Sequence, residues 1–113
     1  MPYIEAKLSA PLGADKKAAL KAAFGEAISL LPGKSERWLM VGIDDGYDLW
    51  LAGEDGPAAM IEVAAFGRID PAASGRLTAA ITRAVSEQTG APPSRIYVKY
   101  SETEFWGFNG SNL

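Results

Sequence analysis

The chain has 113 residues and a net charge of −3, and 48% of its residues are hydrophobic while 22% are charged. This balance is typical of a globular domain, and the acidic charge argues against nucleic-acid or anionic-membrane partners, which need a basic surface. Without Cys or His the chain cannot form disulfides or carry out thiolate or imidazole chemistry, and it lacks the usual transition-metal ligands, so we expect no metal site.

The first predicted element is a strand over residues 3–8, where apolar and polar residues alternate. Pro2 stands at its head, directly behind Met1. Removal of Met1, which aminopeptidases tend to carry out before proline, would leave a secondary amine at Pro2. Burial or a nearby cation would lower the pKa of this amine and keep it neutral, which makes it a candidate general base. The alternative is a proline that only begins a strand.

An amphipathic helix is predicted over residues 14–31, where apolar side chains recur at helical spacing, namely Leu20, Phe24, Ala27, Ile28 and Leu31. Pro32 and Gly33 end this helix. An apolar strand is then predicted over residues 38–43. After a turn at 44–46, residues 47–51 are predicted to be extended again.

A Gly- and Pro-rich loop at residues 53–57 leads to a second strand, helix and strand. The strand is predicted over residues 59–66, and the helix begins with Asp70 as its N-cap and Pro71 at the first helical position. Gly90 ends the helix, and the closing strand covers residues 95–100. Phe105 and Trp106 are predicted to add a short terminal strand.

Residues in the two halves match at a single offset of 57 (61 − 4), as in the pairs Ile4 and Ile61, Glu5 and Glu62, Leu20 and Leu77, and Val41 and Val98. We interpret the chain as one domain of two βαβ units, about residues 2–52 and 58–108. Right-handed crossovers would give an α/β (α+β) fold, a four-stranded mixed sheet with both helices on one face. The runs 38–43 and 58–66 are too apolar to leave the other face open, so we expect subunits to cover one another.

Five segments together resemble the macrophage migration inhibitory factor family of the tautomerase superfamily, in a bacterial form. They are Met1-Pro2, Gly33-Lys34, Phe66 to Ile69, Arg95 to Val98, and Trp106 to Ser111. The resemblance covers nearly the whole chain. It implies a homotrimer with sites at subunit interfaces, and keto–enol tautomerisation of phenylpyruvate-like 2-oxo acids without a cofactor.

The resemblance also implies a role for each matching residue. Pro2 is the general base, and Lys34 binds the substrate carboxylate or the enolate oxygen. Phe66 offers its backbone N–H to the substrate, and Tyr97 comes from the neighbouring subunit. Trp106 and Phe108 would form an apolar, aromatic pocket, although the large aromatic residue of the mammalian members stands at a different position here.

Lys99 departs from the family, which often has Asn at this position, and it could lower the amine pKa or point to solvent. Two other functions stay open: a cytokine-like interaction protein with weak or vestigial tautomerase activity, and a superfamily dehalogenase or decarboxylase. The second would need additional arginines, for which Arg37, Arg68 and Arg95 are candidates. The repeat-related Glu5 and Glu62 are expected to be structural, with lysine partners.

The chain opens with no basic segment followed by an apolar run, and no window approaches the roughly 18 apolar residues of a membrane span. We therefore expect a cytoplasmic protein without membrane partners, while leaderless secretion stays open.

Overall fold

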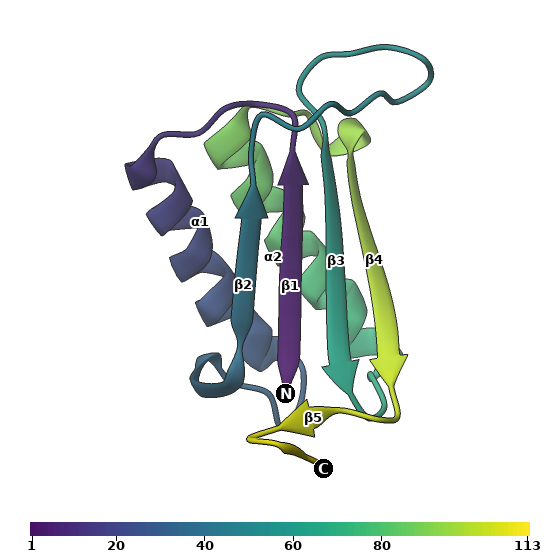
Figure 1. Cartoon of the computed structure of the whole chain (residues 1–113). Coiled ribbons are helices and arrows are strands. Elements are labelled where there is room, and N and C mark those ends of the chain that lie inside the picture. The colour runs from purple at the N-terminus through teal and green to yellow at the C-terminus, as the bar shows by residue number, and fades with distance from the viewer.

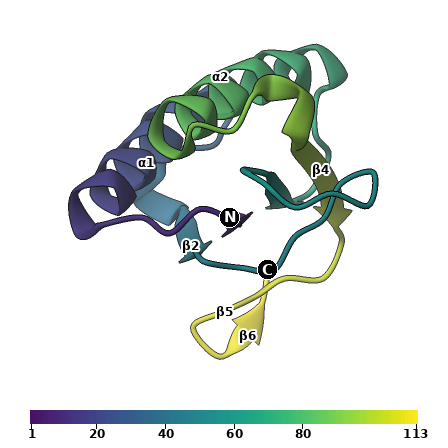
Figure 2. The same ribbon diagram turned by 90° about the horizontal axis from the view of Figure 1, so that it is seen from above.

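The computed structural model describes residues 1–113 and contains a four-stranded sheet with two helices packed on one face, as Figures 1 and 2 show. The strands are β1 (Pro2–Leu8), β2 (Met40–Asp44), β3 (Ala59–Phe66) and β4 (Ile96–Thr103), in the order β2-β1-β3-β4. β2 is parallel to β1 and β4 is parallel to β3, while β1 and β3 are antiparallel. The helices are α1 (Ala14–Ala27) and α2 (Pro71–Thr89). The predicted mixed sheet and one-sided helices are confirmed.

α2 has the ends that its sequence indicates, whereas α1 ends earlier than predicted. In α2 the Asp70 carboxylate accepts a hydrogen bond from the Ala73 N–H at 2.9 Å, and Pro71 is the first helical residue. Gly90 ends α2 in the left-handed conformation, with φ of 77°. α1 ends at Ala27 and is followed by a tighter 3₁₀ turn, η1 (Ile28–Leu30), so the observed α-helix is shorter than the predicted one over residues 14–31.

The core lies between the sheet and the helices. Along β1 and β3 every second side chain is buried, which brings Ile4, Leu8, Ile61 and Val63 against the helical stripes. α1 contributes Leu20 and Phe24 among others, and α2 contributes Leu77, Ile81 and Val85. Buried and partly exposed side chains therefore alternate along the central strands, because the helices cover only one face of the sheet.

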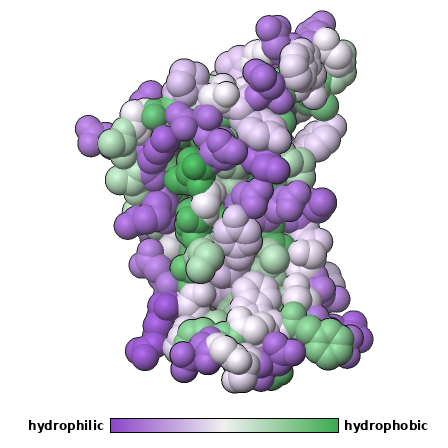
Figure 3. Space-filling model, in the orientation of Figure 1, coloured by the Kyte–Doolittle hydropathy of each residue, from purple (hydrophilic) through white to green (hydrophobic).

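Within one chain the other face of the sheet is uncovered, and its side chains are more polar than the apolar runs 38–43 and 58–66 suggested. Charged side chains cross it, with Lys7 paired to Glu5 at 3.3 Å and Lys99 paired to Glu62 at 3.4 Å. Figure 3 looks onto this face and shows hydrophilic and hydrophobic side chains intermixed. The expected lysine partners of Glu5 and Glu62 are confirmed.

Three sequence predictions about the connecting segments are wrong. Trp38 belongs to a 3₁₀ turn, η2 (Glu36–Trp38), and β2 begins only at Met40. Residues 47–51 form no strand, and Leu51 makes only an isolated bridge with Glu54. The C-terminal strands are β5 (Gly107–Phe108) and β6 (Ser111–Asn112), a small hairpin that follows Phe105 and Trp106. Trp38 and residues 47–51 pair with no strand of the four-stranded sheet, and β5 and β6 pair only with each other.

Residues 57 apart occupy corresponding places in the sheet. Glu5 in β1 lies directly opposite Glu62 in β3. The pairs on either side of it are symmetric: Ile4 lies opposite Val63, and its counterpart Ile61 lies opposite Ala6. A twofold rotation about an axis through the Glu5–Glu62 pair thus places β1 on β3 and β3 on β1. The same rotation exchanges the two ends of the sheet.

Candidate functional site

Pro2 begins β1 and is fully buried. In the register of the sheet it lies opposite Ala65 of β3, next to Phe66, the last residue of that strand. Met1 precedes it and places its carbonyl oxygen 3.0 Å from the backbone N of Phe66, which donates the hydrogen bond. Burial, and secondarily the nearby charge of Lys34, lower the pKa of the Met1 amine below its ordinary value. The amine at the start of the chain is therefore partly shielded from water and lies near a positive charge.

Lys34 reaches the same place from the segment that follows α1. Gly33, with φ of 79°, turns the chain there. The Lys34 ammonium then donates a hydrogen bond to the Phe66 carbonyl at 2.9 Å. Three of the residues singled out from the sequence, Pro2, Lys34 and Phe66, are thus brought together by elements far apart in the chain.

A cleft of about 630 Å³ opens beside Pro2, and we call it the Pro2 cleft. Its lining comes from the start of the chain, from η2 and β2, and from the C-terminal hairpin, with the residues Met1 to Tyr3, Arg37 to Met40 and Trp106 to Phe108. Figure 1 shows the N-terminus and β5 at the same end of the sheet. Apolar and aromatic groups dominate this lining, which suits an aryl group.

Trp106 and Phe108 both line the Pro2 cleft. Phe108 meets the Trp38 ring edge-to-face, with the ring centres 5.5 Å apart. Trp38, which sequence analysis did not assign to the site, is 43% exposed. Nothing in the sequence distinguishes Trp38 from the other apolar residues of the predicted strand. Its place in the lining of the cleft depends on the 3₁₀ turn η2.

Tyr97 and Lys99 lie elsewhere. Tyr97 is paired with Met60 near the start of β3, five residues before Ala65, so it stands roughly 17 Å along the sheet from Pro2. It lines a separate apolar hollow of about 140 Å³ together with Trp50, Ala59 and Arg95, which we call the Tyr97 hollow. Within one chain, Tyr97 does not join the Pro2 cleft, and Lys99 pairs with Glu62 on the open face.

The Pro2 cleft and the Tyr97 hollow are counterparts. Each of the eight residues that line the hollow stands 57 positions from a residue that lines the cleft. Ala59 corresponds to Pro2 in this way, Tyr97 to Met40, and Arg95 to Trp38. The twofold rotation that relates the two ends of the sheet therefore relates the Tyr97 hollow to the Pro2 cleft. The nitrogen of Ala59, which corresponds to that of Pro2, lies within a peptide bond.

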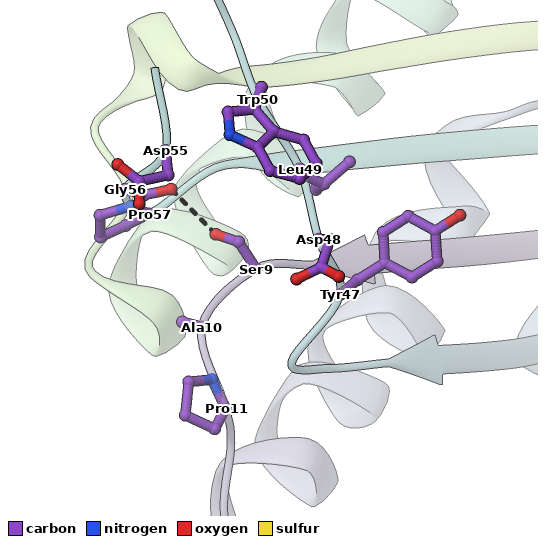
Figure 4. Close-up of a pocket in the computed structure, with 10 residues that line it drawn as sticks. All are labelled: Ser9, Ala10, Pro11, Tyr47, Asp48, Leu49, Trp50, Asp55, Gly56 and Pro57. Carbon is purple, nitrogen blue, oxygen red and sulfur yellow. Dashed lines mark hydrogen bonds between the residues drawn. The ribbon is translucent and has the colours of Figure 1, made fainter. Parts of the chain in front are cut away.

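A further hollow, of about 420 Å³, lies where β1 ends, among the loops around Ser9 and Trp50 (Figure 4). Ser9 fixes these loops, since its hydroxyl donates to the Gly56 carbonyl at 3.0 Å and accepts from the Ala58 N–H at 2.8 Å. Asp48 and Asp55 are the acidic residues of its lining. This hollow is at the end of β1 opposite Pro2 and contains none of the predicted site residues.

The structure contains no group of three or more Asp or Glu side chains placed to hold a metal ion. None of its helices is both long and apolar enough to cross a membrane.

Comparisons with known proteins identify the family. The sequence profile of the macrophage migration inhibitory factor (MIF) family matches residues 1–113. None of the curated proteins matches the chain by sequence. Leishmania major MIF2 is similar in structure, with a TM-score of 0.94, 33% identity, and coverage of 100% of this chain and 97% of that chain.

Two further solved structures are similar. The homologue from Prochlorococcus marinus has a TM-score of 0.87 and 25% identity, with 97% of each chain covered. Pt0534 inactivated by 2-oxo-3-pentynoate has a TM-score of 0.79 and 24% identity, with 90% of this chain and 86% of that chain covered. Since the family profile spans the whole chain, this protein belongs to the macrophage migration inhibitory factor family.

Proposed function

We propose that the protein is a keto–enol tautomerase acting on phenylpyruvate-like 2-oxo acids, with the Pro2 amine as general base and acid after Met1 is removed. The observation that carries this proposal is the buried Pro2 nitrogen at the edge of an aromatic cleft, beside the Lys34 ammonium and the Phe66 backbone. The 2-oxo acid class is also supported by Pt0534, whose solved structure is of the protein inactivated by 2-oxo-3-pentynoate, a 2-oxo acid.

In the proposed reaction the neutral Pro2 amine takes a proton from the carbon next to the ketone. The electrons of that C–H bond form the C=C bond, and negative charge develops on the ketone oxygen. The Lys34 ammonium stabilises this charge, because a preorganised cation acts most strongly where charge develops. The protonated amine then gives its proton to the oxygen, which yields the enol and restores the free base. No cofactor takes part.

Removal of Met1 would prepare the site in two ways. It converts the Pro2 nitrogen from an amide, which has no useful basicity, into an amine. It also removes the carbonyl oxygen that now occupies the Phe66 N–H at 3.0 Å. That donor then becomes free for a substrate oxygen, next to Lys34. The unprocessed chain is therefore inactive for two independent reasons.

The complete site is proposed to need a homotrimer. Tyr97 is 57% exposed and lies at the end of the sheet opposite Pro2, so it can reach a Pro2 cleft only in a neighbouring subunit. Met40, at the edge of β2, is 69% exposed and lines the cleft. Contact between the two ends of neighbouring chains would cover both side chains and enclose the substrate.

The test begins with the intact mass of the purified protein, which establishes whether Met1 is absent. An enol–ketone assay on phenylpyruvate then compares the processed protein with Pro2→Gly, and Pro11→Gly serves as a control at an exposed proline. We expect Pro2→Gly to lose activity, because it replaces the rigid secondary amine of proline with a flexible primary amine, and Pro11→Gly to keep it. Equal rates for the processed protein and Pro2→Gly would rule out the Pro2 mechanism.

A further inference from the structure

The Pro2 cleft carries a single charged side chain in its lining, Arg37. No Asp or Glu lines the cleft, although the chain as a whole has a net charge of −3. Arg37 belongs to η2, on the side of the cleft formed by residues 37–40, whereas Lys34 stands at the Phe66 carbonyl. The cleft and its surroundings therefore present two separate cations.

The Arg37 guanidinium is held on the face of an aromatic ring. Its central carbon lies 5.1 Å from the centre of the Trp38 ring, a cation–π geometry, and Trp38 in turn meets Phe108 edge-to-face. The side-chain hydrogen bonds made by arginine in this structure belong to Arg95, so the Arg37 N–H groups are free to bind a carboxylate. The contact with Trp38 also reduces the conformational freedom that binding would otherwise remove.

No acidic side chain neutralises Arg37. The three ion pairs of the structure join Lys7 to Glu5, Lys17 to Asp45 and Lys99 to Glu62. Glu36, the neighbour of Arg37 in sequence, is turned away toward α1, where its carboxylate lies so close over Gly25 that a Cβ at this glycine would collide with it. The absence of a side chain at Gly25 thus removes the nearest acid from the cleft.

We propose that Arg37 binds a second anionic group of the substrate, at the end away from the 2-oxo acid. The substrate class is then an enolisable aryl 2-oxo acid whose ring carries a carboxylate. Lys34 and the Phe66 N–H take the 2-oxo acid end, the rings of Trp38, Trp106 and Phe108 contact the aryl group, and Arg37 takes the distal carboxylate. This inference rests on the proposed function, because it concerns the same cleft.

The turnover test compares phenylpyruvate with 4-carboxyphenylpyruvate in the processed protein. We expect kcat/KM to be about tenfold to a hundredfold higher for the carboxylated substrate, mainly because KM is lower. This factor corresponds to the usual strength of a hydrogen bond to a charged group. Arg37→Gln should bring this ratio to about one, and Arg37→Lys should retain part of it. Arg76→Gln, an exposed arginine on α2, is the matched control and should keep the full ratio.

A binding test separates this inference from the proposed function. Quenching of tryptophan fluorescence reports ligand binding because Trp38 and Trp106 line the cleft, and the probes are terephthalate and benzoate, which cannot enolise. We expect terephthalate to bind at least tenfold more tightly to the wild-type protein, an advantage that Arg37→Gln removes even if no tautomerase activity is detected. Equal binding of the two probes, or an equal loss for both in Arg37→Gln, would overturn the assignment of Arg37.

Discussion

Replacement of Lys34 by Met is the sharpest test of the electrostatics at the site. Methionine keeps most of the length of the side chain and removes the charge. The Lys34 ammonium now donates a hydrogen bond to the Phe66 carbonyl at 2.9 Å, and its charge contributes to lowering the pKa of the amine that begins the chain. The substitution therefore removes two electrostatic effects and one hydrogen bond.

The expected loss in catalysis is much larger than the expected loss in stability. Removing one preorganised charge that stabilises a developing oxyanion lowers kcat by about 10²- to 10³-fold, or about 3 to 4 kcal/mol. The hydrogen bond to Phe66 is partly exposed and contributes about 1 kcal/mol or less. A domain of this size would then melt only a few degrees lower.

The pH dependence gives a second readout. A general base works in its neutral form, so activity rises as the pH increases through the pKa of the amine. In the chain that keeps Met1, burial and then the Lys34 charge lower the pKa of the Met1 amine. The Pro2 amine of the processed chain would lie at the same place, so we expect the Lys34 charge to lower its pKa as well. Without that charge the pKa moves back toward its ordinary value. The rising limb of the kcat/KM profile should therefore shift to higher pH in Lys34→Met.

The assay measures kcat/KM for phenylpyruvate between pH 5 and 9 in the processed protein, Lys34→Met and Lys16→Met. Lys16 is exposed on α1 and forms none of the ion pairs, so its substitution changes the net charge equally without touching the site. Lys16→Met should behave as the wild-type protein. The reasoning is refuted if Lys34→Met and Lys16→Met have the same rates and the same pH profile.

Leu20→Ala and Leu77→Ala remove fully buried side chains 57 residues apart, and each should cost about 2 to 5 kcal/mol in urea unfolding; a cost below 1 kcal/mol for either would contradict its place in the core. Asp70→Ala removes the cap of α2 and should cost about 1 kcal/mol, measured by thermal unfolding against the Asp55→Ala control in an exposed loop. The Tyr3 hydroxyl, followed by Lys7, lowers the pKa of Glu5, so this carboxylate stabilises the fold above its unfolded pKa of about 4.3 and the benefit is lost as the pH falls through the folded pKa. Urea midpoints measured from pH 7 to 3 should thus fall less steeply in Glu5→Gln, and parallel curves would argue against this pairing.

The parts of the fold predicted correctly are those whose signals are local. β3 has the predicted bounds, 59–66, because a Gly- and Pro-rich loop precedes it and Gly67, with φ of 86°, follows it. α2 lies between its predicted caps, Asp70 and Gly90, for the same reason, since a cap and a left-handed glycine act within one turn. The strand predicted over 47–51 fails because a strand needs a partner, and sequence alternation does not reveal whether one is available.

The sequence predicted part of the geometry of the candidate site. Pro2, Lys34 and Phe66 meet because the antiparallel pairing of β1 and β3 brings the start of one strand to the end of the other. Trp38 was not assigned to this place, and Arg37 was named only as a candidate for an alternative activity, since their directions depend on the 3₁₀ turn η2 that precedes β2. The distance of Tyr97 from Pro2 follows from register, which no local pattern determines.

The rotation through Glu5 and Glu62 limits how many reacting centres the protein can have. The sheet has two equivalent ends, but only one of them holds the start of the polypeptide. At the other end, the counterpart of Pro2 is Ala59, whose nitrogen is locked in a peptide bond, and the counterpart of Lys34 is Ala91. A reagent that modifies the Pro2 amine of the processed chain should therefore saturate at one equivalent per chain, so that the proposed trimer would have three reactive ends and three inert ones.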